Sequence, residues 1–479
     1  MDMSRLPEAA VTPSSDPAPE SERPNVPRPG LAPTLTRRGF TALGSAVAGA
    51  LAAGVLGAGR IRTAVAEHVT GTPTADRPPP EENTRVFSQQ ETTLAFRNYG
   101  LPAEFLDRAI TPLGAHYLLV HFDVPDLKIE DYSLAVGGQV RTPLVVGLDD
   151  LKSRPSVTQV VTMECAGTGR STMSPRAIYV PWKYEAIGTY EWVGTPLRPL
   201  LEEAGLLDDA VEILFTGWDS GVDLGIEHAF ERSLTVEEAL RDGVMLAWEA
   251  NGQPLLPQHG FPLRLVVPSW YGMTSVKWLR AITVLNEPFT GVQQAKVYRY
   301  QQTKDDPGDP VTLKRVHSVM KPPGIPDLIT RQRFVAPGRH AIQGMAWTGY
   351  GSGAIARVEF SADDGATWRD AELAGSAGSF AWTPWIACWT VDEPGEYVLA
   401  CRATDGAGNV QPLDPNEVWN RQGMGGNGVQ RVNVTVQEGV GIAGSTVPSP
   451  VRLVIPGAEV PPTPASPVAE SLATPSPRT

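Results

Sequence analysis

Cys165 and Arg170 are the first residues of this chain whose types and spacing could do chemistry. They lie in "TMECAGTGRS" (162–171), where an apolar run ends at the cysteine and a glycine-rich loop leads to the arginine. A thiolate at a strand end, with glycines that let other groups approach closely, suits a transition metal. The arginine would place a fixed positive charge there for an anion. A lone buried cysteine is more often a small apolar core residue, and spacing alone favours that inert thiol.

A second stretch, "NGQPLLPQHGFPLRLVVPSWYGMTSVKWL" (251–279), carries several cationic side chains. A His-Gly-Phe-Pro-x-Arg step lies between two turns, and a strand and a Gly-x-x-Ser-Val-Lys step follow it. His259, Arg264, Lys277 and nearby backbone amides could converge on a phosphate group. The alternative is that Arg264 and Lys277 are ordinary charges flanking a strand.

Short strands and short helices must position these residues within 93–310. Three segments rich in β-branched and aromatic residues predict strands: "HYLLVHFDV" (116–124), "VEILFTGW" (211–218) and "PLRLVVPS" (262–269). Two segments predict helices, each with a threonine cap and a glycine end: "TPLRPLLEEAGLL" (195–207) and "SLTVEEALRDG" (233–243). Strands and helices do not alternate strictly, so this region is predicted to be an α+β domain.

Beyond the Pro-rich segment "MKPPGIPD" (320–327) the pattern changes to strands separated by Gly/Asp turns. We therefore predict an all-β, immunoglobulin-like sandwich over 311–438. Cys388 and Cys401 flank "TVDEPGEYVLA" (390–400), which is predicted to be a hairpin. A turn at Pro394-Gly395 would place the two cysteines opposite each other and permit a disulfide. A shift of one residue in register would leave two free thiols.

The N-terminal region resembles a targeting segment. Arg37 and Arg38 precede the apolar, Ala/Gly-rich run 41–59, and "AVAE" offers a cleavage site after Ala66. Residues 1–66 are therefore predicted to be a disordered N-terminus with a twin-arginine signal, which implies export to the periplasm or another extracytoplasmic space. The alternative is a retained transmembrane helix. Residues 67–92 are predicted to be a linker, and 439–479 a disordered Pro/Ser/Thr-rich tail.

The charge of the chain excludes one class of function. Its 479 residues carry a net charge of −13. Nucleic-acid binding needs a basic surface to neutralise phosphates, so we expect no nucleic-acid partner. A local basic pocket for a small anion remains compatible with this charge.

Four motifs in a fixed order resemble the sulfite oxidase family of molybdenum-cofactor enzymes. They are "FRNYGLP" (96–102), "ECAGTGR" (164–170), "HGFPLRLVVP" followed by "GMTSVKWL" (259–279), and "WNRQGMGGNGVQRV" (419–432). The resemblance implies a sulfite-oxidase-type molybdopterin-binding domain over 93–310, followed by a dimerisation domain. Thr168 departs from the family, which usually has Asn there, and this leaves the substrate open.

The resemblance also implies roles for individual residues. Cys165 would bind the molybdenum of a molybdenum-molybdopterin cofactor, and Arg97 and Arg170 would line an anion pocket. The expected cofactor-binding residues are Asn98, Asp223, His259, Arg264, Ser275, Val276 and Lys277. The active-site tyrosine would be Tyr298 or Tyr300, and the spacing favours Tyr298.

The expected activity is oxidation of sulfite to sulfate by oxygen-atom transfer, in a homodimer. The chain shows no haem motif, so electrons would pass to an external acceptor, possibly a c-type cytochrome. One alternative is a reductase of a sulfoxide or similar oxo compound that uses the same cofactor. An alternative of another class is a secreted, immunoglobulin-like binding protein without catalysis, and a molybdenum assay would separate that class from the enzymes.

Overall fold

The computed structural model describes residues 88–349 and 351–440, and all of them belong to one compact unit, Glu82–Thr479. The predicted signal, the linker up to residue 87 and the tail from residue 441 lie outside the described residues. Within the described part of the chain, no helix is long and apolar enough to cross a membrane.

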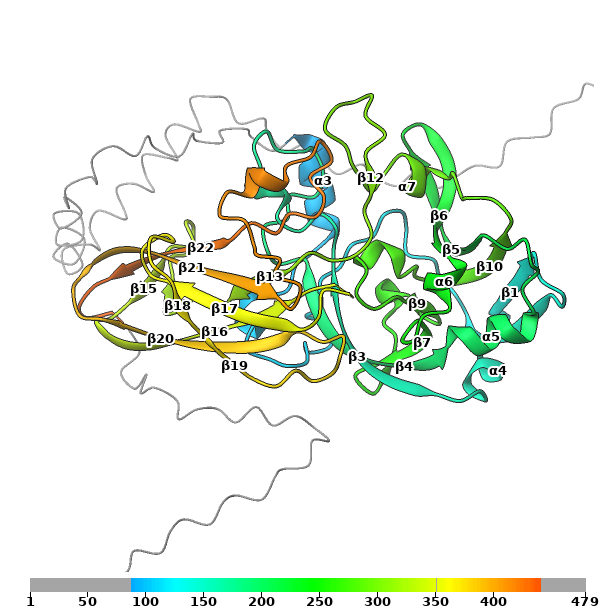
Figure 1. The fold of residues 1–479 in the computed structure, drawn as a ribbon, viewed down its shortest axis with the longest axis horizontal. Coiled ribbons are helices and arrows are strands. Elements are labelled where there is room, and N and C mark those ends of the chain that lie inside the picture. Colours follow the sequence, from blue (N-terminus) through cyan, green and yellow to red (C-terminus); the bar gives the residue numbers. More distant parts are fainter. Residues whose placement is uncertain (1–87, 350, 441–479) are drawn as a thin grey trace, which may run out of the picture. The chain divides into compact units, whose positions relative to one another are not determined.

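Helices are few and short in this part of the chain, which is mostly β (Figure 1). They are α3 (Gln89–Arg97), α4 (Leu148–Lys152), α5 (Leu197–Ala204), α6 (Val236–Ala239) and α7 (Val292–Ala295). The helix predicted at 195–207 is confirmed as α5, which buries its leucines and ends at Gly205 with φ 69°. The second predicted helix forms only one turn, α6, where the Thr235 hydroxyl accepts from Glu238 N at 3.2 Å.

Two sheets enclose the first core. One sheet has the spatial order β2 (Leu144–Gly147), β1 (Ser133–Gly138), β10 (Leu279–Leu285), β5 (Glu212–Asp223), β6 (Ile226–Thr235). The other contains β3 (Val157–Glu164), β4 (Ile187–Pro196), β7 (Met245–Ala250) and β8 (Gln253–Pro254), with β9 (Arg264–Val266) paired to β7. Leu134 and Ile282 from the first sheet share one buried cluster with Leu246 and Leu265 from the second. The strands predicted at 211–218 and 262–269 are confirmed as β5 and β9.

The strand predicted at 116–124 is wrong. This segment is extended but forms only an isolated bridge, between Leu118 and Tyr99. Side chains take the backbone groups that a neighbouring strand would use. Val120 N donates to Asn98 Oδ1 at 2.8 Å, and Lys277 Nζ donates to Leu119 O at 2.8 Å. The β-branched and aromatic composition of the segment predicts a strand, but side chains rather than a neighbouring strand pair with its backbone.

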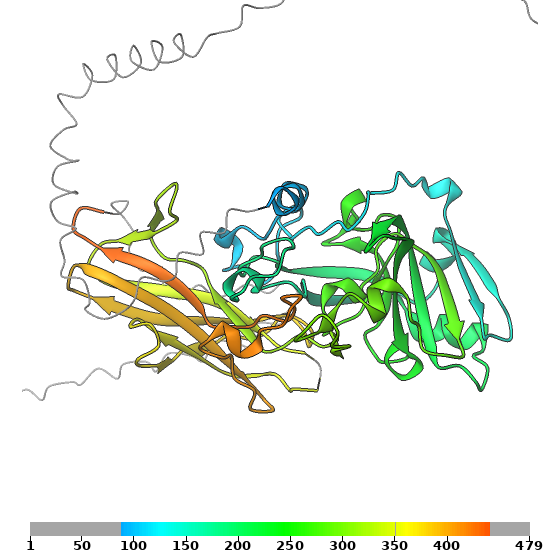
Figure 2. The same ribbon diagram turned by 90° about the horizontal axis from the view of Figure 1, so that it is seen from above.

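Two further sheets form the C-terminal half, which we call the C-terminal sandwich (Figure 2). The first contains β13 (His317–Met320), β16 (Gly338–Trp347), β20 (Thr383–Val391) and β19 (Glu372–Leu373). The second contains β14 (Ile325–Pro326), β15 (Arg333–Val335), β22 (Gln430–Val436), β21 (Gly395–Asp405), β17 (Ile355–Ser361) and β18 (Arg369–Asp370). Ile342 and Trp385 of one sheet share a buried cluster with Val358, Leu399 and Val434 of the other. The immunoglobulin-like topology stays a prediction.

The hairpin predicted around residues 390–400 is wrong. Cys388 lies on β20 opposite Ala341, and Cys401 lies on β21 between Phe360 and Gln430. These strands belong to different sheets, because the connection after Val391 crosses from one sheet to the other. Both thiols are free; Cys388 is exposed and Cys401 is buried.

This arrangement predicts which cysteines react. Under native conditions iodoacetamide should label Cys388 alone, because Cys165 and Cys401 are buried. All three cysteines should be labelled after denaturation without reductant. Peptide mass spectrometry measures both states. Native labelling of Cys401, or a thiol that appears only after reduction, would contradict the structure.

Candidate active site

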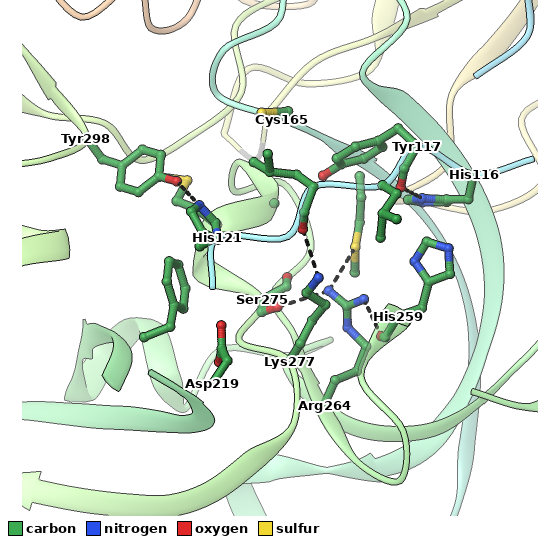
Figure 3. Close-up of a pocket in the computed structure, with 16 residues that line it drawn as sticks. His116, Tyr117, His121, Cys165, Asp219, His259, Arg264, Ser275, Lys277 and Tyr298 are labelled. Atoms are coloured by element: carbon green, nitrogen blue, oxygen red, sulfur yellow. Dashed lines mark hydrogen bonds between the residues drawn. The ribbon is translucent and has the colours of Figure 1, made fainter. Parts of the chain in front are cut away.

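A hollow opens where the ends of β3 and β9 meet the β5–β6 hairpin and the segment 116–121 (Figure 3). We call it the central hollow. Its lining consists of His116, Tyr117, Leu118, Leu119, His121, Met163, Cys165, Asp219, Phe230, His259, Arg264, Gly272, Met273, Ser275, Lys277 and Tyr298. The sequence placed six of these residues in a site: Cys165, His259, Arg264, Ser275, Lys277 and Tyr298.

Cys165 follows directly after β3, and its side chain faces the central hollow. Its backbone N–H donates to Ala186 O at 2.9 Å, and Gly167 N lies 3.4 Å from its Sγ. Burial raises the pKa of this thiol, and the charge of Arg170 opposes the increase. An unliganded Cys165 is therefore a poor nucleophile, whereas a metal ion would displace the proton and bind the thiolate.

Arg170 lies behind the loop that starts at Cys165, and it does not line the central hollow. Its guanidinium is buried and donates to three backbone carbonyls: Val180 O at 3.0 Å, Gln422 O at 3.1 Å and Gly423 O at 3.2 Å. The preceding Gly169 has φ 78°, and a Cβ there would lie 2.5 Å from Gly426 O. The family-like segment 419–432 thus packs directly against the cysteine loop.

Arg264 and Lys277 form a cationic cradle on the other side of the central hollow. Arg264 donates to His259 O and to Ser275 O, both at 2.9 Å. Lys277 Nζ donates to Leu119 O at 2.8 Å and to Gln258 O at 3.1 Å, which leaves one ammonium proton without a bond to these carbonyls. Burial, and then the charge of Arg264, lower the pKa of Lys277. A bound anion would relieve the electrostatic repulsion between Arg264 and Lys277.

Three buried polar atoms at or beside this cradle have no hydrogen-bond partner among the described residues: His259 Nε2, Thr274 Oγ1 and Asp219 Oδ1. Buried polar groups are normally paired, so these atoms indicate room for a polar ligand. The described residues hold no group of three His, Cys, Asp or Glu side chains that could bind a metal. A metal at Cys165 would therefore need ligands from a cofactor.

Asp219 occupies the place that the sequence analysis gave to Asp223. A register irregularity between Thr216 and Ser220 interrupts the pairing of β5 with β6 and leaves Asp219 4% exposed, facing the central hollow. Asp223 lies four residues further on and accepts from Gln293 Nε2 at 3.0 Å outside the hollow. A β-bulge changes which side chains of a strand face inward, so Asp219 rather than Asp223 lines the hollow, and a cofactor-binding role for Asp223 stays a prediction.

Tyr298 has its hydroxyl 2.5 Å from His121 Nε2 (Figure 3). Burial lowers the pKa of His121 to about 3, so the ring is neutral. Burial also raises the pKa of Tyr298, which keeps the phenol protonated. Tyr298 adopts φ 57°, a conformation that side chains rarely tolerate except where function or packing requires it. Tyr300, in β11 (Arg299–Tyr300), does not line the hollow.

Comparisons with known proteins agree with this geometry. Residues 121–293 match the family described as the oxidoreductase molybdopterin binding domain, and residues 313–437 match the Mo-co oxidoreductase dimerisation domain. The chain is 34% identical to mitochondrial sulfite oxidase of Mus musculus over 381 residues, which are 76% of this chain and 68% of the relative. It is 33% identical to sulfite oxidase of Gallus gallus over 369 residues, 74% of this chain and 78% of the relative.

The chain belongs to the sulfite oxidase family. It is a molybdopterin-dependent oxidoreductase, and its cofactor is molybdenum-molybdopterin. A solved structure, the sulfane dehydrogenase SoxCD from Paracoccus pantotrophus, superimposes with a TM-score of 0.61 at 26% identity and covers 76% of this chain and 96% of that chain. The donor set fits this cofactor, because a soft thiol and a cationic cradle face one hollow.

Several residues that the sulfite-oxidase-like motifs assign to the site lie outside the central hollow. Arg97 ends α3, donates to Phe122 O at 2.7 Å and pairs with Asp123 at 3.2 Å. Asn98 caps α3 and holds the segment 116–121 through Val120 N. Val276 is a buried core residue between two lining residues. The end of α3 turns Arg97 and Asn98 toward residues 120–123, so neither lines the hollow, and their roles at the anion and cofactor sites stay predictions.

The sequence analysis missed His116, Tyr117 and His121, which line the central hollow. The signal was present: two histidines five residues apart in an apolar run are unusual for a plain strand. The β-propensity of residues 116–124 instead predicts a strand.

The cradle predicts that Lys277 retains the cofactor. In Lys277→Met, a charge-assisted hydrogen bond of about 1.5–3 kcal/mol is lost, so dialysed protein should keep its cofactor roughly 10- to 100-fold less tightly. Molybdenum per protein chain, measured by mass spectrometry of the metal, reports the loss. Lys321→Met is the control, because Lys321 pairs with Asp107 outside the hollow. Equal molybdenum retention in both variants would refute the role of Lys277.

The neutral state of His121 predicts a pH dependence. Its pKa is depressed from about 6.5 to about 3 in the folded state, so the unfolded state binds more protons between these values. Above pH 6.5 His121 is neutral in both states and does not reduce the free energy of unfolding. As the pH falls below 6.5 the unfolded state takes up the proton first, so the free energy of unfolding decreases. In His121→Gln, which keeps a partner for Tyr298, the fall of the thermal midpoint between pH 6.5 and 4 should be shallower than in wild type. Parallel curves for the two proteins would contradict this assignment.

Proposed function

We propose that this protein oxidises sulfite to sulfate and passes the electrons to an external carrier such as a c-type cytochrome. The observation that carries the proposal is a buried thiol, Cys165, facing one hollow with two cations, the buried Arg264 and the half-buried Lys277, in a chain whose net charge is −13. The sulfite oxidases at 33–34% identity support sulfite as substrate.

In this proposal the bound cofactor supplies the oxygen-atom transfer, and the chain supplies position and charge. Cys165 would bind the molybdenum as a thiolate. Arg264, Lys277 and Ser275, with the unpartnered Nε2 of His259, would bind the phosphate of the pterin. Asp219 Oδ1 is free to accept hydrogen bonds from N–H groups of the same ligand.

Tyr298 and Arg170 would act on the substrate side. The hydrogen bond between the neutral His121 and the Tyr298 hydroxyl would fix the direction of that hydroxyl at the edge of the hollow. Arg170 would contribute a fixed positive charge behind Cys165. Its donors are occupied by backbone carbonyls, so it would attract an anion through the field rather than by direct bonds.

Three further proposals concern assembly and location. The dimerisation domain matched at 313–437 supports a homodimer, with the C-terminal sandwich of immunoglobulin-like type. The twin-arginine pattern at Arg37-Arg38 supports export to an extracytoplasmic compartment. The third proposal is a separate electron acceptor of the c-type cytochrome kind.

A second candidate reaction is oxidation of a less charged sulfur compound, such as a sulfane. It is favoured by Arg97, which lies outside the central hollow, and by Arg170, whose donors are engaged. The sulfane dehydrogenase superimposed at a TM-score of 0.61 supports the same substrate class.

The test is turnover by purified, molybdenum-loaded protein with sulfite, with a sulfane compound and, in reverse, with a sulfoxide. Sulfite should reduce cytochrome c or ferricyanide. Arg170→Gln should lower kcat/KM for sulfite, because it removes a fixed positive charge whose field attracts the anion. Sulfane turnover without sulfite turnover would favour the second candidate, and sulfoxide reduction alone would overturn both oxidations.

A further inference from the structure

The strand that carries Cys165 has two different faces at its end. Side chains alternate along β3, so Met163 and Cys165 face the central hollow. Thr162 and Glu164 face the C-terminal sandwich. Thr162 N donates to Phe380 O at 3.0 Å, and its hydroxyl accepts from Trp382 N at 2.7 Å. The sandwich therefore contacts the strand end from behind.

Glu164 is the centre of this contact, and it is only 1% exposed. One carboxylate oxygen lies 3.0 Å from His317 Nδ1, and the other accepts from Trp347 Nε1 at 2.8 Å. Both partners belong to strands of the sandwich, β13 and β16. Lys314, also buried, donates to Thr162 O at 2.5 Å. A carboxylate buried this deeply persists only where donors and charges compensate it.

The position of Glu164 matters because the next residue is Cys165. The carboxylate is bonded to the sandwich on one side of the strand end, while the Cys165 thiol faces the central hollow on the other side. The side chain of Glu164 cannot move toward solvent without breaking both of its bonds to the sandwich. The charge next to the thiol is thus fixed in place by residues more than 150 positions later in the chain.

We propose that Glu164 is a positioning residue through which the C-terminal sandwich fixes Cys165 and sets the charge beside the metal. This inference rests on Cys165 as the molybdenum ligand. A negative charge near a metal stabilises its more oxidised state. Loss of the charge should therefore raise the midpoint potential of the molybdenum, while loss of a donor that compensates the charge should lower it.

Glu164→Gln tests the charge with little change in shape. The glutamine oxygen can accept from Trp347, and its amide can donate to Nδ1 of the other His317 tautomer. Redox titration of the holoenzyme should give a higher midpoint potential than in wild type. Trp347→Phe keeps the charge but removes one donor, and it should shift the potential downward.

The matched control is Glu359→Gln. Glu359 is another buried carboxylate of the sandwich, 4% exposed, and it accepts from Arg402 at 2.7 and 3.1 Å and pairs with Arg357 at 3.0 Å. Its loss should lower the thermal midpoint but leave the potential unchanged, since it lies on β17, which is not paired with β3. If Glu164 had only a structural role, Glu164→Gln and Trp347→Phe would both behave like this control.

The inference is overturned if Glu164→Gln and Trp347→Phe both have the wild-type potential. Cys165→Ser separates this failure from a wrong metal ligand. If Cys165→Ser keeps its molybdenum, the ligand assignment fails, and the inference fails with it. If Cys165→Ser loses its molybdenum while both test variants keep the wild-type potential, the role of Glu164 alone is refuted.

Discussion

Enclosure of two cations, the buried Arg264 and the half-buried Lys277, by backbone carbonyls is the constraint on which the site depends. Arg264 and Lys277 are held by carbonyls of residues 119, 258, 259 and 275. Each carbonyl must point inward, so the surrounding chain forms turns and extended segments instead of regular strands. Gly260 shows the cost: it has φ 109°, and a Cβ there would lie within 3.1–3.2 Å of the Cβ atoms of Arg264 and Lys277.

The same solution recurs behind the cysteine loop. Arg170 is also buried among carbonyls, and two of them come from the segment 419–432 at the end of the sandwich. Asn420 shapes that segment, because its side chain donates to Met424 O at 2.7 Å and accepts from Met424 N at 2.9 Å. The Trp-Asn motif is thus tied to the metal-binding loop as well as to the domain in which it lies.

Much of the site could be predicted from the sequence, and the errors have physical causes. The strand-like runs around Cys165 and Arg264 predict β3 and β9, whereas the family resemblance assigned Cys165, Arg264 and Lys277 to one site. Asp219 escapes sequence reasoning because a β-bulge cannot be read from alternation. A short motif does not show which way a helix end turns, so it could not place Arg97 outside the hollow. The hairpin predicted between Cys388 and Cys401 is wrong because the short connection between Val391 and Gly395 joins strands of two different sheets, and only packing decides this.

The contact between Arg170 and the carbonyls of Gln422 and Gly423 joins residues 252 and 253 positions apart. A ribosome releases the first half of this chain long before the second exists. During most of translation the cysteine loop therefore lacks the segment 419–432 that packs behind it. The loop can reach its final form only after residue 423 has been made. A chain that ends before residue 422 would leave Arg170 without these two carbonyl partners.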